Sequence, residues 1–303
     1  MTGGAAGHRS GFGCFVGRPN VGKSTLLNAM VGIKVAITSS QPQTTRRAVR
    51  GIITRPDAQL VLVDTPGVHR PRTLLGERLG DLVRSVMSDV DVVGFCLPAN
   101  EKIGPGDRRL AAELTEQVGR TPVIGVLTKT DTVPPARIAE GLLALSQLRD
   151  FAEVVPVSAV ADRQVGLLVD LLVARLPAGP DLYPDGEVTD EPIDTRIAEI
   201  VREAALDGVR DELPHSLAVL VTEMGPRDNS DLTDIFATVF VERDSQKAIV
   251  LGHKGSRLVA VGRRARLQIE DLLGARVYLR LHVAVAKDWQ RDPKQLRTLG
   301  FPS

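Results

Sequence analysis

Short apolar runs alternate with amphipathic stretches along the first 178 residues, a pattern that predicts strands followed by crossover helices. Several runs are apolar on both faces, as strands are when helices cover both sides of a sheet. The candidate strands are residues 12–16, 60–64, 90–97, 121–128 and 154–158. The pattern therefore predicts an α/β domain over residues 1–178, with a mainly parallel, doubly wound sheet.

A stretch with four prolines and two glycines, residues 177–192, interrupts this pattern and predicts a semi-rigid linker over residues 179–193. Beyond it come a helical pattern, strand-like runs at 217–222 and 235–241, and a second helical region. In the last run, residues 276–285, every odd position is apolar, as in a strand with one buried face. We expect a small α+β domain over residues 194–303.

Directly after the first predicted strand stands G-x-x-x-x-G-K-[ST], the pattern of a phosphate-binding loop. Its glycines permit a tight turn whose backbone N–H groups face a phosphate, and the following helix adds positive potential. Lys23 would reach the β and γ phosphates of a nucleotide, and Ser24 would ligate Mg²⁺. The predicted nucleotide contacts here are Gly17, Arg18, Pro19, Asn20, Val21, Gly22, Lys23, Ser24 and Thr25.

Three further motifs follow predicted strands. D-x-x-G supplies a carboxylate for Mg²⁺ and a glycine N–H for a γ-phosphate, a sequence like the guanine-reading N-K-x-D follows, and a Ser-Ala pair comes after the next strand. Since ligands bind at the carboxyl ends of parallel strands, these motifs predict one nucleotide site. Its further residues are Asp64, Thr65, Pro66, Gly67, Val68, Thr128, Lys129, Thr130, Asp131, Ser158 and Ala159.

Asp131 favours guanine over adenine, because a carboxylate accepts hydrogen bonds from guanine's N1–H and 2-amino group, whereas adenine has an acceptor at N1 and no 2-amino group. Thr128 stands where the motif has Asn, which removes an amide able to donate and accept at once. A nucleotide kinase could use the same phosphate loop, but Asp131 and D-x-x-G disfavour that alternative. We therefore expect GTP and GDP as ligands.

The threonine-rich segment 43–47 is a candidate switch in which Thr45 can close over Mg²⁺ and the γ-phosphate. Alone it would be a solvated loop; beside the other motifs it completes a predicted metal set of Ser24, Thr45 and Asp64. Val68 follows D-x-x-G where Ras-like proteins have a water-orienting glutamine, so we expect slow, partner-sensitive hydrolysis. His69 is expected to face solvent.

Composition adds limits. The chain of 303 residues has a net charge of +1, which excludes a uniformly basic coat. Its charge is nevertheless uneven, at +5 over residues 1–180, −12 over 181–242 and +8 over 243–303. Cys14 and Cys96 lie in apolar runs and are expected to be buried thiols rather than a disulfide. Without a signal-peptide core or a long apolar run, we expect a soluble cytoplasmic protein.

These motifs resemble those of the Era family of bacterial GTPases over almost the whole length. The likeness rests on the phosphate loop, D-x-x-G, Pro42-Gln-Thr-Thr-Arg46, Tyr183-Pro-Asp-Gly-Glu-Val-Thr-Asp190 and Val241-Glu-Arg-Asp-Ser-Gln-Lys247. It implies a Ras-like GTPase domain followed by a type II KH domain (α-β-β-α-α-β) with a C-terminal tail. It also implies catalytic roles for Lys23, Thr45 and Gly67, and a K⁺ ion held by Asn20 in place of an arginine finger.

The same resemblance assigns Gly252-His253-Lys254-Gly255 to the G-x-x-G loop with which KH domains clamp about four nucleotides of RNA backbone. Alone, four such residues could form any helix–helix turn. The local excess of basic residues supports RNA binding, although the arginines at 263–266 could equally form a solvated helix face. The predicted RNA contacts are Lys247, Gly252, His253, Lys254, Gly255, Arg257, Arg263 and Arg264.

The expected function is a GTP-hydrolysing switch that binds near the 3′ end of 16S rRNA and acts in assembly of the small ribosomal subunit. The resemblance further implies a monomer with some peripheral association with the inner face of the cell membrane. The alternative is a GTPase whose C-terminal domain mainly docks protein or membrane partners. The charge of the G-x-x-G loop discriminates between them, because only RNA binding requires it.

Overall fold

The computed structural model describes residues 7–39, 41, 44–67, 73–209, 213–228 and 230–301. The chain divides into two compact units, each with its own core. Unit 1 comprises Met1–Thr38, Thr45–Pro71 and Glu77–Asp190; unit 2 comprises Ser39–Thr44, Arg72–Gly76 and Glu191–Ser303. Within the described ranges, no helix combines the length and the apolar character that crossing a membrane requires.

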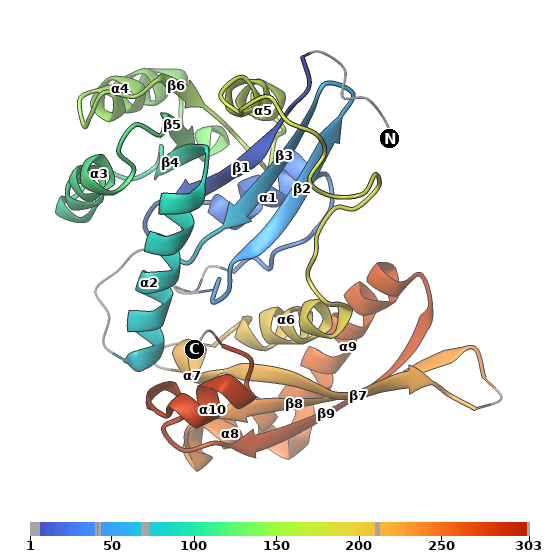
Figure 1. Ribbon diagram of the computed structural model, residues 1–303. Helices are drawn as coiled ribbons and strands as arrows, with labels where there is room; N and C mark the ends of the chain where they lie inside the picture. Colours follow the sequence, from blue (N-terminus) through green and yellow to red (C-terminus); the bar gives the residue numbers. More distant parts are fainter. Residues whose placement is uncertain are drawn as a thin grey trace. The chain divides into compact units, whose positions relative to one another are not determined.

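Unit 1 is built on a six-stranded sheet in the order β2-β3-β1-β4-β5-β6 (Figure 1). All neighbouring strands pair in parallel except β2 and β3, which are antiparallel. The predicted mainly parallel sheet is confirmed, but β2 was not among the predicted strands because its Arg50 and Arg55 interrupt the apolar run. The bounds are β1 Arg9–Val16, β2 Val49–Arg55, β3 Ala58–Asp64, β4 Val92–Pro98, β5 Val123–Thr128 and β6 Glu153–Pro156.

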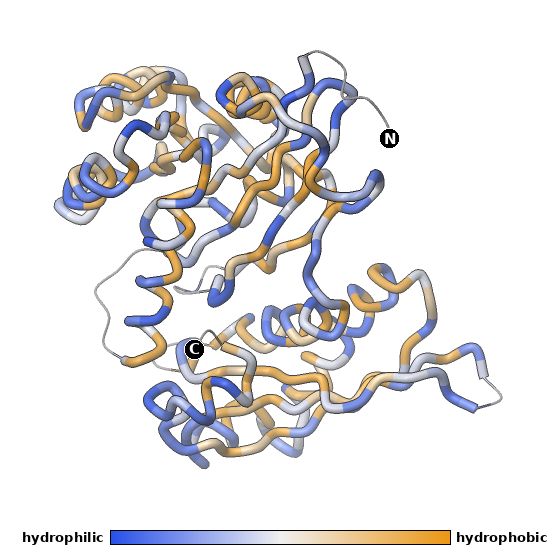
Figure 2. The backbone as a smooth tube through the Cα atoms, viewed as in Figure 1, coloured by the Kyte–Doolittle hydropathy of each residue, from blue (hydrophilic) through white to orange (hydrophobic). Residues whose placement is uncertain are grey.

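Helices cover both faces of this sheet. On one face α1 (Lys23–Val31) and α5 (Val165–Val173) pack on strand residues such as Phe15 and Leu62. On the other, α2 (Leu74–Asp89), α3 (Pro105–Gln117) and α4 (Pro135–Ser146) pack on Val16 and Phe95. In Figure 2 the central strands of the sheet are mostly hydrophobic, whereas hydrophobic and hydrophilic residues alternate along the helices. The doubly wound α/β prediction is confirmed, and the carboxyl ends of β1, β3 and β5 share one edge, where the predicted motifs begin.

The segment after α5 lies along the edge of this sheet. The side chain of Gln59 on β3 accepts hydrogen bonds from the backbone N–H groups of Leu182 and Tyr183 and donates to the carbonyl of Tyr183. The N–H of Ile52 on β2 donates to the carbonyl of Val188 at 2.9 Å. These hydrogen bonds give this proline-containing segment a defined course within unit 1.

Unit 2 has a three-stranded sheet in the order β7-β8-β9, packed against α6, α8 and α9. Along β9 the odd residues 277–285 face the core, as their period of two predicts, and the even residues face away. The order of the main elements is α-β-β-α-α-β, which confirms the expected type II KH topology. The bounds are α6 Ile193–Leu206, α7 Leu213–Ser216, β7 Ala218–Pro226, β8 Leu232–Val241, α8 Asp244–Leu251, α9 Ser256–Leu273, β9 Arg276–Val285 and α10 Pro293–Thr298.

Candidate functional site

The phosphate loop connects β1 to α1 at the carboxyl edge of the sheet. Lys23 begins the helix and is almost fully buried, and its Nζ donates to the carbonyls of Gly17 at 3.1 Å and Arg18 at 3.0 Å. Burial lowers the pKa of Lys23, against the opposing effect of the nearby Asp64 carboxylate. A buried ammonium held inside its own loop is a strong donor for an anion that enters that loop.

Three oxygen-bearing side chains meet beside the lysine. Ser24 Oγ donates to Asp64 Oδ2 at 2.6 Å and Thr45 Oγ1 donates to the same oxygen at 3.0 Å, while the two hydroxyls lie 3.0 Å apart. The other carboxylate oxygen, Oδ1, is buried and lacks a hydrogen-bond partner among the described residues. Burial raises the pKa of Asp64. Hard oxygen donors around a buried carboxylate suit Mg²⁺, so the residues present fit that ion.

The D-x-x-G segment lies against the phosphate loop. A Cβ placed on Gly67 would come within 2.6 Å of the backbone nitrogen of Pro19, so only glycine permits this approach. Thr65 holds the segment to β1 through a hydrogen bond from its Oγ1 to the carbonyl of Phe15 at 2.7 Å. The predicted residue Val68, like His69, lies outside the described residues.

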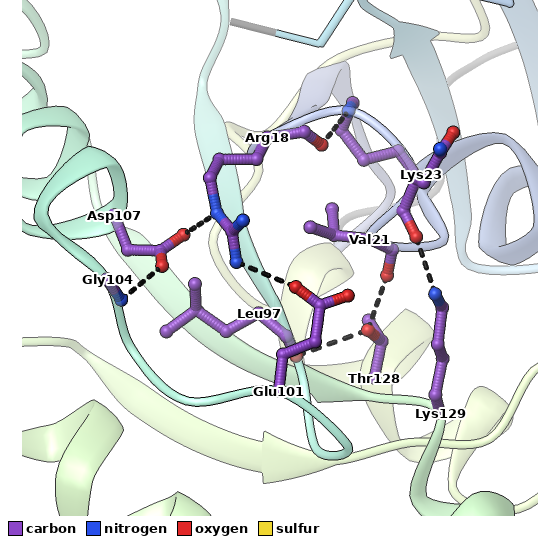
Figure 3. A network of polar contacts seen from close by, with 10 residues as sticks. Arg18, Val21, Lys23, Leu97, Glu101, Gly104, Asp107, Thr128 and Lys129 are labelled. Carbon is purple, nitrogen blue, oxygen red and sulfur yellow. Dashed lines mark hydrogen bonds and ion pairs between the residues drawn. The ribbon is translucent and has the colours of Figure 1, made fainter. Parts of the chain in front are cut away.

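The guanine-reading segment is tied to the Ser-Ala motif and to the phosphate loop. Ser158 Oγ donates to Asp131 Oδ1 at 2.6 Å and so orients the carboxylate that would read the base. On the other side, Lys129 Nζ donates to the carbonyl of Asn20 at 2.6 Å and Thr128 Oγ1 to that of Val21 at 2.5 Å (Figure 3). The Thr128 hydroxyl is therefore already used within the protein.

The structure thus brings together the described residues that the sequence assigned to one nucleotide site. Arg18 differs from the other predicted nucleotide contacts, because its side chain points away from the loop, towards Asp107 and Glu101 near α3. Those two acids were missed by sequence reasoning. Asp107 lies in the first turn of α3, a position that says nothing about a partner 89 residues away.

In unit 2, the G-x-x-G loop joins α8 to α9. Gly252 has φ 69° and ψ 178°, and a Cβ on it would lie 2.7 Å from the Cβ of Arg257, so glycine is required. Lys254 adopts φ 50°, an uncommon conformation for a residue with a side chain. His253 and Lys254 are both exposed. The loop presents two cationic or polar side chains on a backbone shaped by two glycines.

The other predicted RNA contacts fall into two groups. Arg257 donates from Nη2 to the carbonyls of Ala205 at 3.1 Å and Asp207 at 2.7 Å, and Arg264 forms an ion pair with the Asp207 carboxylate. The side chains of these two arginines therefore bind groups at the C-terminal end of α6. Arg263 is exposed and Lys247 half-buried on the helices that flank the loop.

Comparisons with known proteins match a different family model to each of the two units. The family model for 50S ribosome-binding GTPase matches residues 13–129, and the KH domain model matches residues 212–290. GTPase Era of Streptomyces coelicolor is 62% identical over 303 residues, covering 97% of this chain and 95% of that protein. GTPase Era of Mycobacterium sp. (strain JLS) is 60% identical, covering 97% and 99%.

Two solved structures match over nearly the full length. The crystal structure of Era in complex with MgGDPNP and nucleotides 1506–1542 of 16S ribosomal RNA has a TM-score of 0.92 and 36% identity, covering 98% of this chain and 100% of that one. The crystal structure of an Aquifex aeolicus Era variant bound to GDP·AlF4⁻ has a TM-score of 0.92 and 35% identity, covering 97% and 100%.

Proposed function

The chain belongs to the Era family of GTPases, and from that premise we propose that it is a GTP-driven switch that binds the 3′ end region of 16S rRNA during assembly of the small ribosomal subunit. That it hydrolyses GTP follows from the family. The observation that supports the RNA partner most is the G-x-x-G loop, which sits between α8 and α9 in the KH topology with His253 and Lys254 exposed.

For the nucleotide, we assign Lys23 and the loop N–H groups to the β and γ phosphates, the Gly67 N–H to the γ-phosphate and Asp131 to guanine. Ser24, Thr45 and Asp64 would hold Mg²⁺, which when bound neutralises charge on the transferred phosphoryl group. Ser158 orients Asp131 through its 2.6 Å hydrogen bond and so fixes the specificity for guanine.

Hydrolysis is proposed to be slow without a partner or a potassium ion. Asn20 holds φ 63°, and Lys129 fixes its carbonyl, so its side chain is presented from a constrained turn. We assign Asn20 to a K⁺ site that supplies positive charge during hydrolysis. Exchanging K⁺ for Na⁺ in a phosphate-release assay should slow turnover, and Asn20→Ala should remove that difference.

For RNA, we assign the backbone clamp to Gly252–255 with charge from His253 and Lys254, supported by Lys247 and Arg263. Arg257 and Arg264 contribute through their contacts with α6. The solved complex of Era with nucleotides 1506–1542 of 16S ribosomal RNA supports this choice of RNA for a chain 36% identical to it.

The proposed organisation is a GTPase domain over residues 1–178, a linker over 179–193 and a KH domain with its tail over 194–303. In this proposal GTP orders the Thr45 and Gly67 loops, which favours RNA binding, and hydrolysis reverses it. We further propose a monomer that is cytoplasmic, with peripheral association with the inner face of the cell membrane; flotation with anionic lipid vesicles tests the last point.

Fluorescence anisotropy with a labelled oligonucleotide from the 3′ end of 16S rRNA tests the function. We expect tighter binding with a nonhydrolysable GTP analogue than with GDP. An oligonucleotide of the same length and scrambled sequence is the control for charge alone. Equal affinity for both oligonucleotides would contradict the proposed RNA target, and equal affinity with both nucleotides would contradict the switch.

A further inference from the structure

The side chain of Arg18 links the phosphate loop to the start of α3 (Figure 3). Its Nε donates to Oδ1 of Asp107 at 2.5 Å and its Nη2 donates to Oε2 of Glu101 at 3.0 Å. The backbone carbonyl of the same residue accepts from Nζ of Lys23 at 3.0 Å. Arg18 therefore connects the buried lysine of the loop to a helix that packs on the sheet.

Asp107 is built into that helix. Its side chain is 1% exposed, and its second oxygen, Oδ2, accepts from the N–H of Gly104 at 2.8 Å, immediately before α3 begins. The helix is held in place by Leu110 and Leu114, which are buried against the sheet. A buried carboxylate that lost its cationic partner would leave an uncompensated charge, so this pair differs from a solvated surface ion pair.

The opposite side of the loop is held differently. There Lys129 and Thr128 bind the carbonyls of Asn20 and Val21, so the loop is fixed from the guanine-reading segment as well. Arg18 supplies the corresponding connection towards α3. Because a phosphate is bound by several backbone N–H groups at once, the loop must hold all of them in place before the ligand arrives.

We propose that Arg18 and Asp107 are positioning residues for nucleotide binding, and that neither side chain contacts the nucleotide. The ion pair ties Arg18 to the start of α3, which keeps the loop in its phosphate-binding conformation. Without the pair, nucleotide binding must order the loop, and the loss of affinity appears mainly as faster dissociation. The inference concerns the nucleotide alone and stands whether or not the chain binds RNA.

Asp107→Asn tests this inference most selectively. Asparagine has nearly the same size and keeps an oxygen for the Gly104 N–H, but it lacks the charge that pairs with Arg18. The control is Arg109→Ala. Arg109 lies on α3 two residues after Asp107, and its ion pair with Glu113, at 3.2 Å, is on the exposed face of the same helix. The readout is the dissociation rate of fluorescent GDP from the full chain, with Arg18→Ala and the double variant measured alongside.

We expect Asp107→Asn and Arg18→Ala each to speed dissociation by about tenfold, since small misplacements of binding groups have effects of this size or larger. The double variant should be no faster than either single one, because both remove the same interaction. The turnover rate at saturating GTP should fall much less than the affinity. Arg109→Ala should stay within about twofold of the unaltered chain.

A wild-type rate for Asp107→Asn would overturn the inference, even if Arg18→Ala dissociates faster, since Arg18 would then act on the nucleotide directly. Additive effects in the double variant would overturn it as well. Arg18→Lys provides a milder test should the alanine variant fold poorly. Lysine keeps the charge but cannot reach two carboxylates with a planar fork, so an intermediate rate is expected and a wild-type rate would contradict the proposal.

Discussion

The phosphate loop of unit 1 and the G-x-x-G loop of unit 2 use the same local device in different surroundings. Each ends in a left-handed glycine, Gly22 or Gly255, immediately before a helix, and each carries a non-glycine residue in the left-handed region, Asn20 or Lys254. Both are therefore suited to presenting backbone N–H groups to phosphate. They differ in what holds them in place.

We call the phosphate loop enclosed because Lys23 is buried and side chains from α3 and from the guanine-reading segment hold it from two sides, although Asn20 is exposed. In the G-x-x-G loop His253 and Lys254 are exposed. Behind it, Arg257 at the start of α9 donates hydrogen bonds to carbonyls at the end of α6. An enclosed loop suits a small ligand of fixed shape, whereas an open loop suits one segment of a long polymer. The same backbone arrangement is therefore suited to different ligands, depending on the residues that surround it.

The largest expected effect comes from the enclosed loop. Lys23→Ala should lower the rate of GTP hydrolysis by about a hundredfold or more, because it removes a buried cation from the transferred phosphates. Phosphate release measures this. RNA binding in the absence of nucleotide should be unchanged, and a parallel loss of both activities would show that the two loops are not separable as described.

The reciprocal change is made in the open loop. The double variant His253→Asp, Lys254→Asp should bind RNA at least about tenfold more weakly, since two negative charges would face the RNA backbone. Anisotropy measures the affinity at a fixed salt concentration. The variant should bind GDP normally, because the loop belongs to unit 2 and every predicted nucleotide residue belongs to unit 1. Unaltered RNA affinity would instead favour a C-terminal domain that docks protein or membrane.

A smaller effect is expected from removing Arg257, which connects the G-x-x-G loop to the end of α6. Arg257→Ala should weaken RNA binding by about twofold to fivefold, as a cation at a helix C-terminus contributes only a modest free energy. Arg257→Lys, which keeps that charge, should recover part of the loss. A loss as large as that of the double variant at His253 and Lys254 would show that Arg257 contacts RNA itself, as the sequence alone suggested.

The smallest effect concerns the strand beneath the phosphate loop. Cys96 on β4 is fully buried. Burial is the main cause that raises its pKa to about 12; the charge of Asp64 acts in the same direction and that of Lys23 in the opposite one. At pH 8 the thiolate is scarce, so alkylation of the native chain should be negligible and should become complete on unfolding. Mass spectrometry after iodoacetamide treatment checks this. Rapid labelling of folded protein would mean that the base of the phosphate loop opens.

Much of this arrangement could be predicted from the sequence because motif spacing and periodicity are local. The strands before Gly17 and Gly67 and the alternating residues of β9 were recognisable for that reason. The antiparallel edge strand β2 was missed, since its arginines break the apolar run. Partners distant in sequence were also missed: Asp107 pairs with Arg18, and Arg257 turns to α6, because of packing that no short pattern records.

The central claim is that GTP binding and RNA binding are coupled, and linkage tests it most directly. If a GTP analogue tightens RNA binding by some factor, RNA must tighten binding of the analogue by the same factor. The measurement is the affinity of the analogue with and without saturating 16S 3′-end oligonucleotide. The account predicts a shift equal to the difference in RNA affinity between analogue-bound and nucleotide-free protein, and a smaller shift for the double variant at His253 and Lys254 at the same oligonucleotide concentration. An affinity for the analogue that RNA leaves unchanged would contradict the coupling.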